Sequence, residues 1–488
     1  MRTGRICFLL GKILIILGLT MLLPLITALI CKEGDALAFA LSAALSCACG
    51  GALMWAFRGS REQNLRHRDS FLFVTMVWVE SALFGALPYL IYGCLIDPAA
   101  ALFESMSGFT TTGATVITDI EALPHGILLW RSLTHWLGGA GIVLLLISLV
   151  QKPSATSEGS MIFRAEFSGG ALAERVAARA EDNAKAIFGV YIIMTLLAAL
   201  ALLLCGMSPF DAINHALSIA ATGGFSTKNA SIGYYNSPLI EWVVAIFLLL
   251  FSINFTLYYL FFVRRRYKKA LHDPELRLFL ILVVFFVAII TFSLWRGFYT
   301  EYNALHSLRY AFFQTASLIS SGGFVTADYD QWPSLARMAL FLLLIVGGCA
   351  GSTAGSVKTN RFYIAFAAVK RELTAVFRPN TISTLHYNGK SVSSSVARSM
   401  TYYLYIYFAL ALGSALLLCA MGVDWIEALV AAFATIGNNG PAFGSFGPAG
   451  TFASLCAGGK LLLSLLMLIG RLELYTVLVL LVPALWRK

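Results

Sequence analysis

One short pattern occurs four times in this 488-residue chain, and it limits the folds that the chain can adopt. The first copy is SGFTTTGAT at residues 107–115, and looser copies start at residue 221 (ATGGFSTKN), residue 320 (SSGGFVTAD) and residue 435 (TIGNNGPAF). When one glycine of each copy is aligned, the steps between copies are about 100 to 120 residues, the size of a structural repeat. The aligned glycines are Gly113, Gly224, Gly323 and Gly440. We therefore expect four copies of one structural unit.

Each copy lies between two long apolar runs and follows a short, mildly amphipathic segment. The whole chain is 59 % hydrophobic and only 12 % charged, with a mean hydropathy of +0.79, which is typical of a polytopic membrane protein. Irregular backbone at membrane depth is tolerated only where it is buried in protein or lines a water-filled cavity. A single copy is equally well explained as a polar turn between helices. Four copies in register favour re-entrant pore loops around one axis, the layout of an ion-selectivity filter.

The distribution of basic residues agrees with this topology. Every basic segment follows an even number of expected spans, and every pore loop falls on the opposite side, as the positive-inside rule requires. The net charge of +10 is therefore a topology signal, not a sign of nucleic-acid binding. We predict an all-α membrane protein with an N-terminal helical hairpin and four helix–pore-loop–helix repeats in pseudo-fourfold arrangement around one pore. The expected boundaries are 1–69 for the hairpin and 70–185, 186–274, 275–395 and 396–488 for the repeats, with a polar cytoplasmic segment at 151–185.

Backbone carbonyl groups are the candidate ligands for the ion. A cation that crosses the membrane sheds water only if oxygen atoms replace its hydration shell, and an extended strand containing glycine can present a ring of them. The pore helices point their partly negative C-termini at the same place. Acidic residues just beyond the loops (Asp119, Glu121, Asp328 and Asp330) would concentrate cations at the mouth. The predicted ion-binding residues are Thr111, Thr112, Gly113, Thr222, Gly223, Gly224, Ser321, Gly322, Gly323, Asn438, Asn439 and Gly440.

Two further features lie at membrane depth. The stretch GGCAGSTAGSVK at 347–358 interrupts the third inner helix with small and polar residues, which form helix poorly. From the residues alone it suits a helix-packing face, although its lysine needs a cavity or a partner at this depth. Arg471 is a second intramembrane cation, which fits either a salt bridge with Glu473 or a side chain that extends to the membrane surface.

These stretches resemble the TrkH/KtrB/HKT superfamily of potassium transporters, and most of all its TrkH members. The resemblance rests on the four loops, on WRSLTHWLGG at 130–139 and on GGCAGSTAGSVK at 347–358, and it covers essentially the whole chain. The N-terminal hairpin favours TrkH over KtrB. In this superfamily glycine at all four filter positions accompanies potassium preference, so Gly113 argues for potassium. Ala354 and Ser356 stand where the family pattern leads us to expect glycine.

The resemblance also implies how such a chain works. It implies potassium uptake, by a channel or a symport mechanism, in a homodimer of the bacterial inner membrane. It implies that the segment 347–358 is an intramembrane loop that blocks the pore below the filter and moves on activation, and that Arg471 is a positive barrier there. The predicted gate residues are therefore Gly347, Gly348, Gly351, Gly355, Lys358 and Arg471. The resemblance also implies a cytosolic NAD- or ATP-binding subunit of the TrkA type. That partner would dock on the basic segments at 264–269 and 370–378. Potassium would be the transported substrate, and the chain itself would carry no organic cofactor.

Other functional classes fit the sequence less well. There is no Walker A, HExxH or other catalytic motif, so we do not expect an enzyme. A secondary transporter of another solute, coupled to sodium or protons, remains the alternative, but that class uses two inverted repeats whereas these four have one orientation. A permanently closed structural or sensor protein would be expected to have a disrupted filter copy, and all four are intact.

Overall fold

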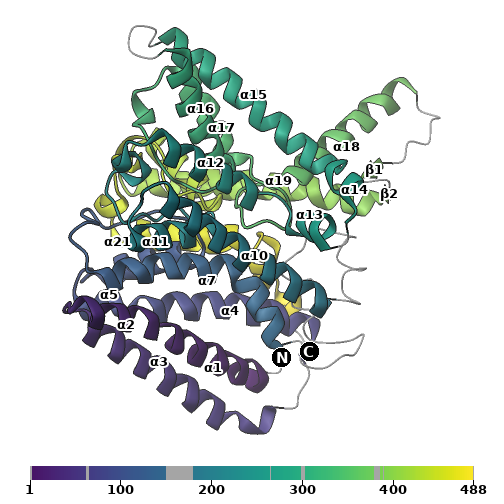
Figure 1. Cartoon of the computed structure of the whole chain (residues 1–488). Helices are drawn as coiled ribbons and strands as arrows, with labels where there is room; N and C mark the ends of the chain where they lie inside the picture. The colour runs from purple at the N-terminus through teal and green to yellow at the C-terminus, as the bar shows by residue number, and fades with distance from the viewer. Residues whose placement is uncertain are drawn as a thin grey trace.

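The computed structural model describes residues 3–61, 65–149, 180–263, 265–297, 303–378, 385–387 and 390–486. Within these residues the chain is almost entirely helical, and the helices gather around a centre where short segments meet (Figure 1). Most of the segment 151–185, which we expected on the cytoplasmic side, lies outside the described residues, as does Arg264 of the basic segment 264–269.

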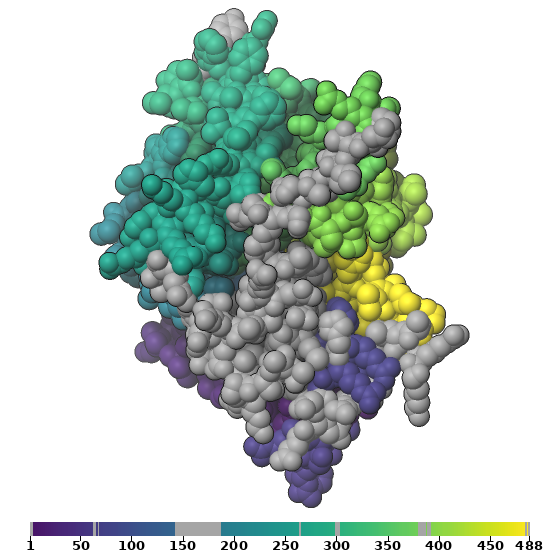
Figure 2. Space-filling view, turned by 90° about the vertical axis from the view of Figure 1, so that its right-hand side faces the viewer, coloured from purple at the N-terminus to yellow at the C-terminus, as the bar shows by residue number. Residues whose placement is uncertain are grey.

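Six helices of the described part are long and apolar enough to cross a membrane, or up to eight if two bent helix pairs each count as one span. A span needs about 20 apolar residues, because each residue of a helix rises about 1.5 Å through a core about 30 Å thick. The N-terminal hairpin provides two of the six, in α1 (Thr3–Thr20) continued by α2 (Leu22–Cys31), and in α3 (Ala36–Ala56). It packs on the first repeat, at the end of the molecule opposite the third repeat (Figures 1 and 2).

The four repeats follow in order, each with an outer helix, a pore helix, a loop and an inner helix. The first contains α4 (His67–Gly85), α5 (Leu87–Tyr92), α6 (Pro98–Phe109) and α7 (His125–Leu149). The second contains α10 (Ala180–Leu204), α11 (Pro209–Ala220), α12 (Pro238–Phe251), α13 (Phe255–Tyr258) and α14 (Tyr267–Leu271). The third contains α15 (Pro274–Gly297), α16 (Ala304–Ile319), α17 (Ser334–Ile345), α18 (Thr359–Phe377) and a small hairpin of β1 (Leu385–Tyr387) and β2 (Lys390–Val392). The fourth contains α19 (Ser394–Ala420), α20 (Trp425–Ile436), α21 (Ala457–Arg471), α22 (Tyr475–Leu478) and α23 (Pro483–Trp486).

The pore helices α6, α11, α16 and α20 are too short to cross the membrane. Three of them have 12 residues, so each spans only about 18 Å. All four begin at a side-chain cap, which satisfies an otherwise unpaired backbone N–H at the helix start. The caps are Asp97, Ser208, Asn303 and Asp424. As the sequence predicted, each of these short helices lies directly before one of the four loops.

Three of the four inner helices are broken beneath the pore loops. The chain bends by 91° between α12 and the helical turns after it, and by 109° between α21 and α22. Between α17 and α18 it leaves helical structure altogether from residue 346 to residue 358. The sequence predicted only this last interruption. At the break after α21, Glu473 and Leu474 both have left-handed backbone angles, with φ of 55° and 52°.

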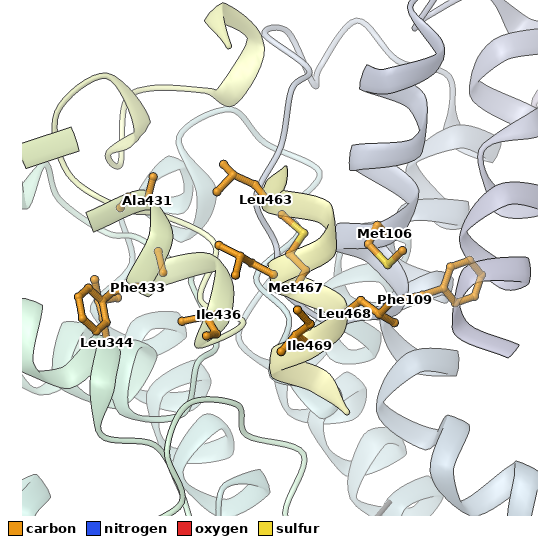
Figure 3. Close-up of a cluster of buried hydrophobic side chains, with 14 of the residues drawn as sticks. Met106, Phe109, Leu344, Ala431, Phe433, Ile436, Leu463, Met467, Leu468 and Ile469 are labelled. Carbon is orange, nitrogen blue, oxygen red and sulfur yellow. The ribbon is translucent and has the colours of Figure 1, made fainter. Parts of the chain in front are cut away.

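A continuous apolar core surrounds the pore helices. Figure 3 shows α21 between α20 and α6, with Met467 and Leu468 among the side chains that fill the space on either side. Both are nearly inaccessible, at 0 % and 3 % exposure. Close packing of this kind fixes the positions of the pore helices and hence of the loops that follow them.

Candidate functional site

The four pore helices end in the same hydrogen-bond pattern. The third residue after the end of each helix donates its N–H to the carbonyl five residues earlier, and the residue before it donates to the carbonyl three residues earlier, which is a Schellman motif. In the first repeat these bonds are Thr112 to Ser107 (2.9 Å) and Thr111 to Gly108 (3.1 Å). The other three loops repeat both bonds, with donors Gly223 and Thr222, Gly322 and Ser321, and Asn439 and Asn438.

A left-handed residue opens each loop, and in none of the four is it glycine. The φ angles are 55° at Thr111, 52° at Thr222, 56° at Ser321 and 53° at Asn438. Glycine is the usual residue at this point of the motif, since other residues pay about 1 kcal/mol or more for the conformation. A polar side chain in this position is therefore retained for a contact that it makes. Three of these side chains contact groups outside their own loop: Thr111 contacts Arg471, Ser321 contacts Gly355, and Asn438 donates to Thr112 Oγ1 of the first loop.

The aligned glycines form a closed ring. A Cβ added to Gly113 would collide with Gly223 O, and one added to Gly224 would collide with Gly322 O. A Cβ on Gly323 would come within 3.0 Å of Pro441, and one on Gly440 would meet the backbone of Gly113 and Thr112 at 2.7 to 2.9 Å. Each loop thus touches the next, and the fourth touches the first. The four copies, up to 327 residues apart in sequence (113 to 440), meet around one axis.

The fourth copy differs in its backbone. Gly113, Gly224 and Gly323 have positive φ angles of 81°, 89° and 64°, whereas Gly440 does not. The next residue is Pro441, and a proline pushes the residue before it toward extended conformations. Gly440 is therefore required for space alone, and the other three glycines are required for both space and conformation.

The twelve residues predicted to bind the ion share one further property. None of their carbonyl oxygens accepts any of the hydrogen bonds found among the described residues. Ten of the twelve residues are buried, the two others being Gly113 and Gly224. Buried carbonyl groups are almost always paired, so a cluster without partners indicates a place that water or a cation fills. A cavity of about 150 Å³ opens above the ring, lined by all four aligned glycines.

A buried ion pair supports the first two loops. Arg131 of α7 bonds Glu104 of the pore helix α6 at 3.0 Å, and both side chains are at most 1 % exposed. The same guanidinium donates to Ser226 O at 3.2 Å and lies 4.1 Å from the centre of the Phe225 ring. Glu104 also accepts the N–H of residue 116, beyond the first filter glycine. Sequence reasoning missed this pair, although a lone glutamate in the apolar pore helix α6 is a signal that could have revealed it.

The acidic residues at the mouth connect neighbouring loops. Asp119 accepts a hydrogen bond from the side chain of Asn229 in the second repeat at 3.0 Å, and this bond lowers the pKa of the Asp119 carboxyl group. Asp330 accepts the N–H of Gly444 in the fourth repeat at 3.0 Å. Partial burial raises the pKa of Asp330 to about 6. These acids therefore hold the loops together as well as adding negative charge at the entrance.

The segment 346–358 lies directly against the start of the filter loops. Ser356, with a left-handed φ of 56°, donates its N–H to Gly437 O at 2.7 Å and its hydroxyl to Leu344 O at 2.7 Å. Ser321 Oγ accepts the N–H of Gly355 at 2.5 Å. On its other side the segment is held by the break in the second inner helix, where Ser252 O accepts the N–H of Cys349 at 2.9 Å. The predicted gate glycines are thus packed between three of the four repeats.

Arg471 touches both the filter and this segment. Its guanidinium donates to Thr111 Oγ1 at 3.1 Å, to Thr353 O at 3.1 Å and to Gly138 O at 2.9 Å. The alternative partner considered from the sequence, Glu473, instead forms an ion pair with Arg361 of α18. Lys358 is buried and donates to Ala354 O within the segment. The cationic side chains of Arg471 and Lys358, together with the segment 346–358, therefore lie directly below the ring of aligned glycines.

A family model described as TrkH, cation transport protein, matches residues 36–488. The chain belongs to the TrkH family. It is 36 % identical over 484 residues to the Trk system potassium uptake protein TrkH of Halomonas elongata, covering 98 % of both chains. It is 35 % identical over 480 residues to the protein of the same name from Escherichia coli K12, again with 98 % of both covered.

TrkH similarity extends to the tertiary structure. The crystal structure of the potassium transporter TrkH from Vibrio parahaemolyticus matches with a TM-score of 0.89 and 32 % identity, over 100 % of both chains. The fold predicted from the sequence is confirmed. As a TrkH family member the chain is a transporter and not an enzyme, and it resides in the bacterial inner membrane.

Proposed function

We propose that this chain takes up potassium across the cytoplasmic membrane through a selectivity filter made of the four loops. The observation that carries the proposal is the closed ring of Gly113, Gly224, Gly323 and Gly440, together with twelve carbonyl groups that no described residue satisfies. Such oxygens can replace the hydration shell of a potassium ion. The relatives are named potassium uptake proteins, which agrees with potassium as the proposed substrate.

In this proposal the segment 346–358 is the gate. It crosses beneath the ring, and its contacts with its surroundings are individual hydrogen bonds, among them those accepted by Ser321 Oγ, Gly437 O and Ser252 O, each of which breaks at modest cost. Its glycines, Gly347, Gly348, Gly351 and Gly355, supply the backbone freedom for movement. Arg471 and Lys358 add a positive barrier that the ion meets after the filter, and displacement of the segment would move Thr353 away from Arg471.

The energy source and assembly are also proposals. We infer that the chain forms a homodimer and that a cytosolic TrkA-like subunit binding NAD or ATP drives the gate. Helix α18 begins directly after the gate, at Thr359, and its other end carries the exposed basic segment 370–378. A partner that displaces this basic end would therefore also displace the end of the gate at residue 358. The chain itself then needs no organic cofactor.

Growth of a strain without its own potassium uptake systems tests the proposal. We expect the native chain, expressed with a TrkA-like partner, to restore growth at low potassium. Gly113→Ser should weaken growth at low potassium and raise competition by sodium, because a side chain there collides with Gly223 O and widens the ring. Absence of rescue by the folded native chain with its partner would contradict potassium uptake.

Gly206→Ser is the matched control. Gly206 has a φ of 94°, similar to that of Gly113, but a Cβ there has open space around it and lies far from the ring. The two variants carry the same backbone strain, so an effect on growth at low potassium seen only with Gly113→Ser is due to the filter. Equal loss in both variants, at equal protein levels, would assign the effect to folding.

A further inference from the structure

The outer face carries a cluster of metal-ligand side chains away from the pore. The thiol of Cys31, a carboxylate oxygen of Glu33 and a ring nitrogen of His125 lie within 4.8 Å of one another. Cys31 ends α2 and Glu33 follows in the connection to α3, whereas His125 is the first residue of α7. The cluster therefore bridges the N-terminal hairpin and the first repeat, two parts of the chain 92 residues apart.

The local backbone holds the three donors in place. Lys32, between the two hairpin ligands, has a left-handed φ of 56° and reverses the chain. Glu33 Oε2 accepts the backbone N–H of His125 at 2.6 Å, and Oε1 lies 2.6 Å from Nδ1 of the same residue. One carboxylate oxygen is thus fixed by the backbone, and the other shares a proton with the imidazole. A metal ion can replace that proton.

A buried carboxylate lies beside the cluster. Asp35 is 0 % exposed, and among the described residues only the backbone N–H groups of Asp35 itself and of Ile127 lie close enough to interact with its oxygens, without a hydrogen bond of ordinary geometry. A Cβ on Gly126, the residue after His125, would collide with Asp35 Oδ2, so this carboxylate lies against the start of α7. Burying a carboxylate is costly, and a cation bound nearby would offset that cost.

The geometry points to a divalent transition-metal site of the zinc class, formed by Cys31, Glu33 and His125, with Asp35 balancing its charge or completing the coordination. Thiolate, imidazole and carboxylate together are the ligand types of zinc and not of potassium, magnesium or calcium. In a tetrahedral site with bond lengths of about 2.0 to 2.3 Å, the ligand atoms lie about 3.3 to 3.8 Å apart. The three ligand atoms here lie within 4.8 Å of one another, so movements of each side chain by about 1 Å would bring them to that spacing. The ion would fasten the hairpin to the first repeat.

Metal binding by the purified full chain tests the site independently of transport. The protein is freed of any affinity tag, reduced with a phosphine, incubated with Zn²⁺, dialysed and assayed by mass spectrometry for bound zinc. We expect about one zinc per chain and a melting temperature that rises with Zn²⁺, because an ion that binds the folded chain more tightly than the unfolded chain stabilises the fold. Co²⁺ as a probe should give a thiolate charge-transfer absorption band.

Variants distinguish this site from incidental binding. Cys31→Ser should abolish the Co²⁺ charge-transfer band, and both Cys31→Ser and His125→Gln should weaken zinc binding about 100-fold or more and remove the thermal shift. Cys456→Ser is the control, because this thiol is also exposed but lies outside the cluster, and serine can keep its cap on Gly459. Less than stoichiometric zinc on the folded native chain, or equal retention in all three variants, would overturn the proposal.

Discussion

Ser356 Oγ accepts a hydrogen bond from the side-chain amide of Asn439 at 3.0 Å, which joins the intramembrane segment to the fourth filter loop. The same hydroxyl reaches Leu344 O and Gly437 O. This is one of the two positions where the chain departs from the glycines expected of its family. Serine here holds a left-handed backbone that glycine would adopt more easily, and it adds contacts that glycine lacks. The segment is therefore anchored where the family pattern leads us to expect flexibility.

Removing this hydroxyl should ease opening. Ser356→Ala loses the contacts of Oγ, worth about 1 to 2 kcal/mol to the closed arrangement. We expect rubidium flux into proteoliposomes to rise by up to about tenfold. Ser352→Ala is the control, since Ser352 Oγ bonds only Cys349 O inside the segment and should leave flux near the native level. Unchanged flux in Ser356→Ala would show that this anchor does not limit opening.

The charge of Arg471 should set the barrier below the filter. Arg471→Gln keeps a donor for Thr111 Oγ1 or Thr353 O but removes the positive charge, worth about 1 to 3 kcal/mol against a cation a few ångströms away. Flux measured with rubidium should increase several-fold, while Arg471→Lys should stay near native. An equal increase in both variants would mean that side-chain shape, not charge, forms the barrier.

The ion pair of Arg131 and Glu104 should be essential for stability. Arg131→Met leaves Glu104 buried and unpaired, and breaking a buried pair in this way costs about 3 to 5 kcal/mol. A large drop in melting temperature in detergent is expected. Arg371→Ala breaks the pair with Glu372, whose side chain is 69 % exposed, and should cost less than about 1 kcal/mol. Similar melting temperatures for the two variants would refute a structural role for the buried pair.

Stability should depend on pH through Asp330. Burial raises the pKa of this carboxyl group to about 6, above its value in the unfolded chain, so the folded protein binds the proton more tightly. Between about pH 4 and pH 6 the free energy of unfolding should therefore decrease as pH rises, and above about pH 6 this contribution should be constant. Asp330→Asn keeps an acceptor for the Gly444 N–H and should lessen that slope. Melting curves of both proteins across this range test the assignment, and identical slopes would contradict it.

Local sequence determined much of this protein. Hydropathy identified the chain as a helical membrane protein, and each pore helix was recognisable from about a dozen residues, with its cap at one end and its polar loop at the other. These features depend on hydrogen bonds and burial within one short segment of the chain. The order of residue types in that segment is therefore enough to predict them. The four aligned glycines were likewise evident because the pattern repeats.

Only the tertiary structure decided which loop touches which, and what each charge pairs with. Arg471 bonds Thr111, 360 residues away, Glu473 pairs with Arg361 of another repeat, and Arg131 pairs with Glu104 across two packed helices. The breaks after α12 and α21 were also not evident from the sequence. At the first, Phe255 N–H bonds Gly351 O and Ser252 O accepts Cys349 N–H, so the third repeat supplies partners for backbone groups that the break leaves open. Such contacts depend on how distant helices pack, and no local pattern of residue types specifies that packing.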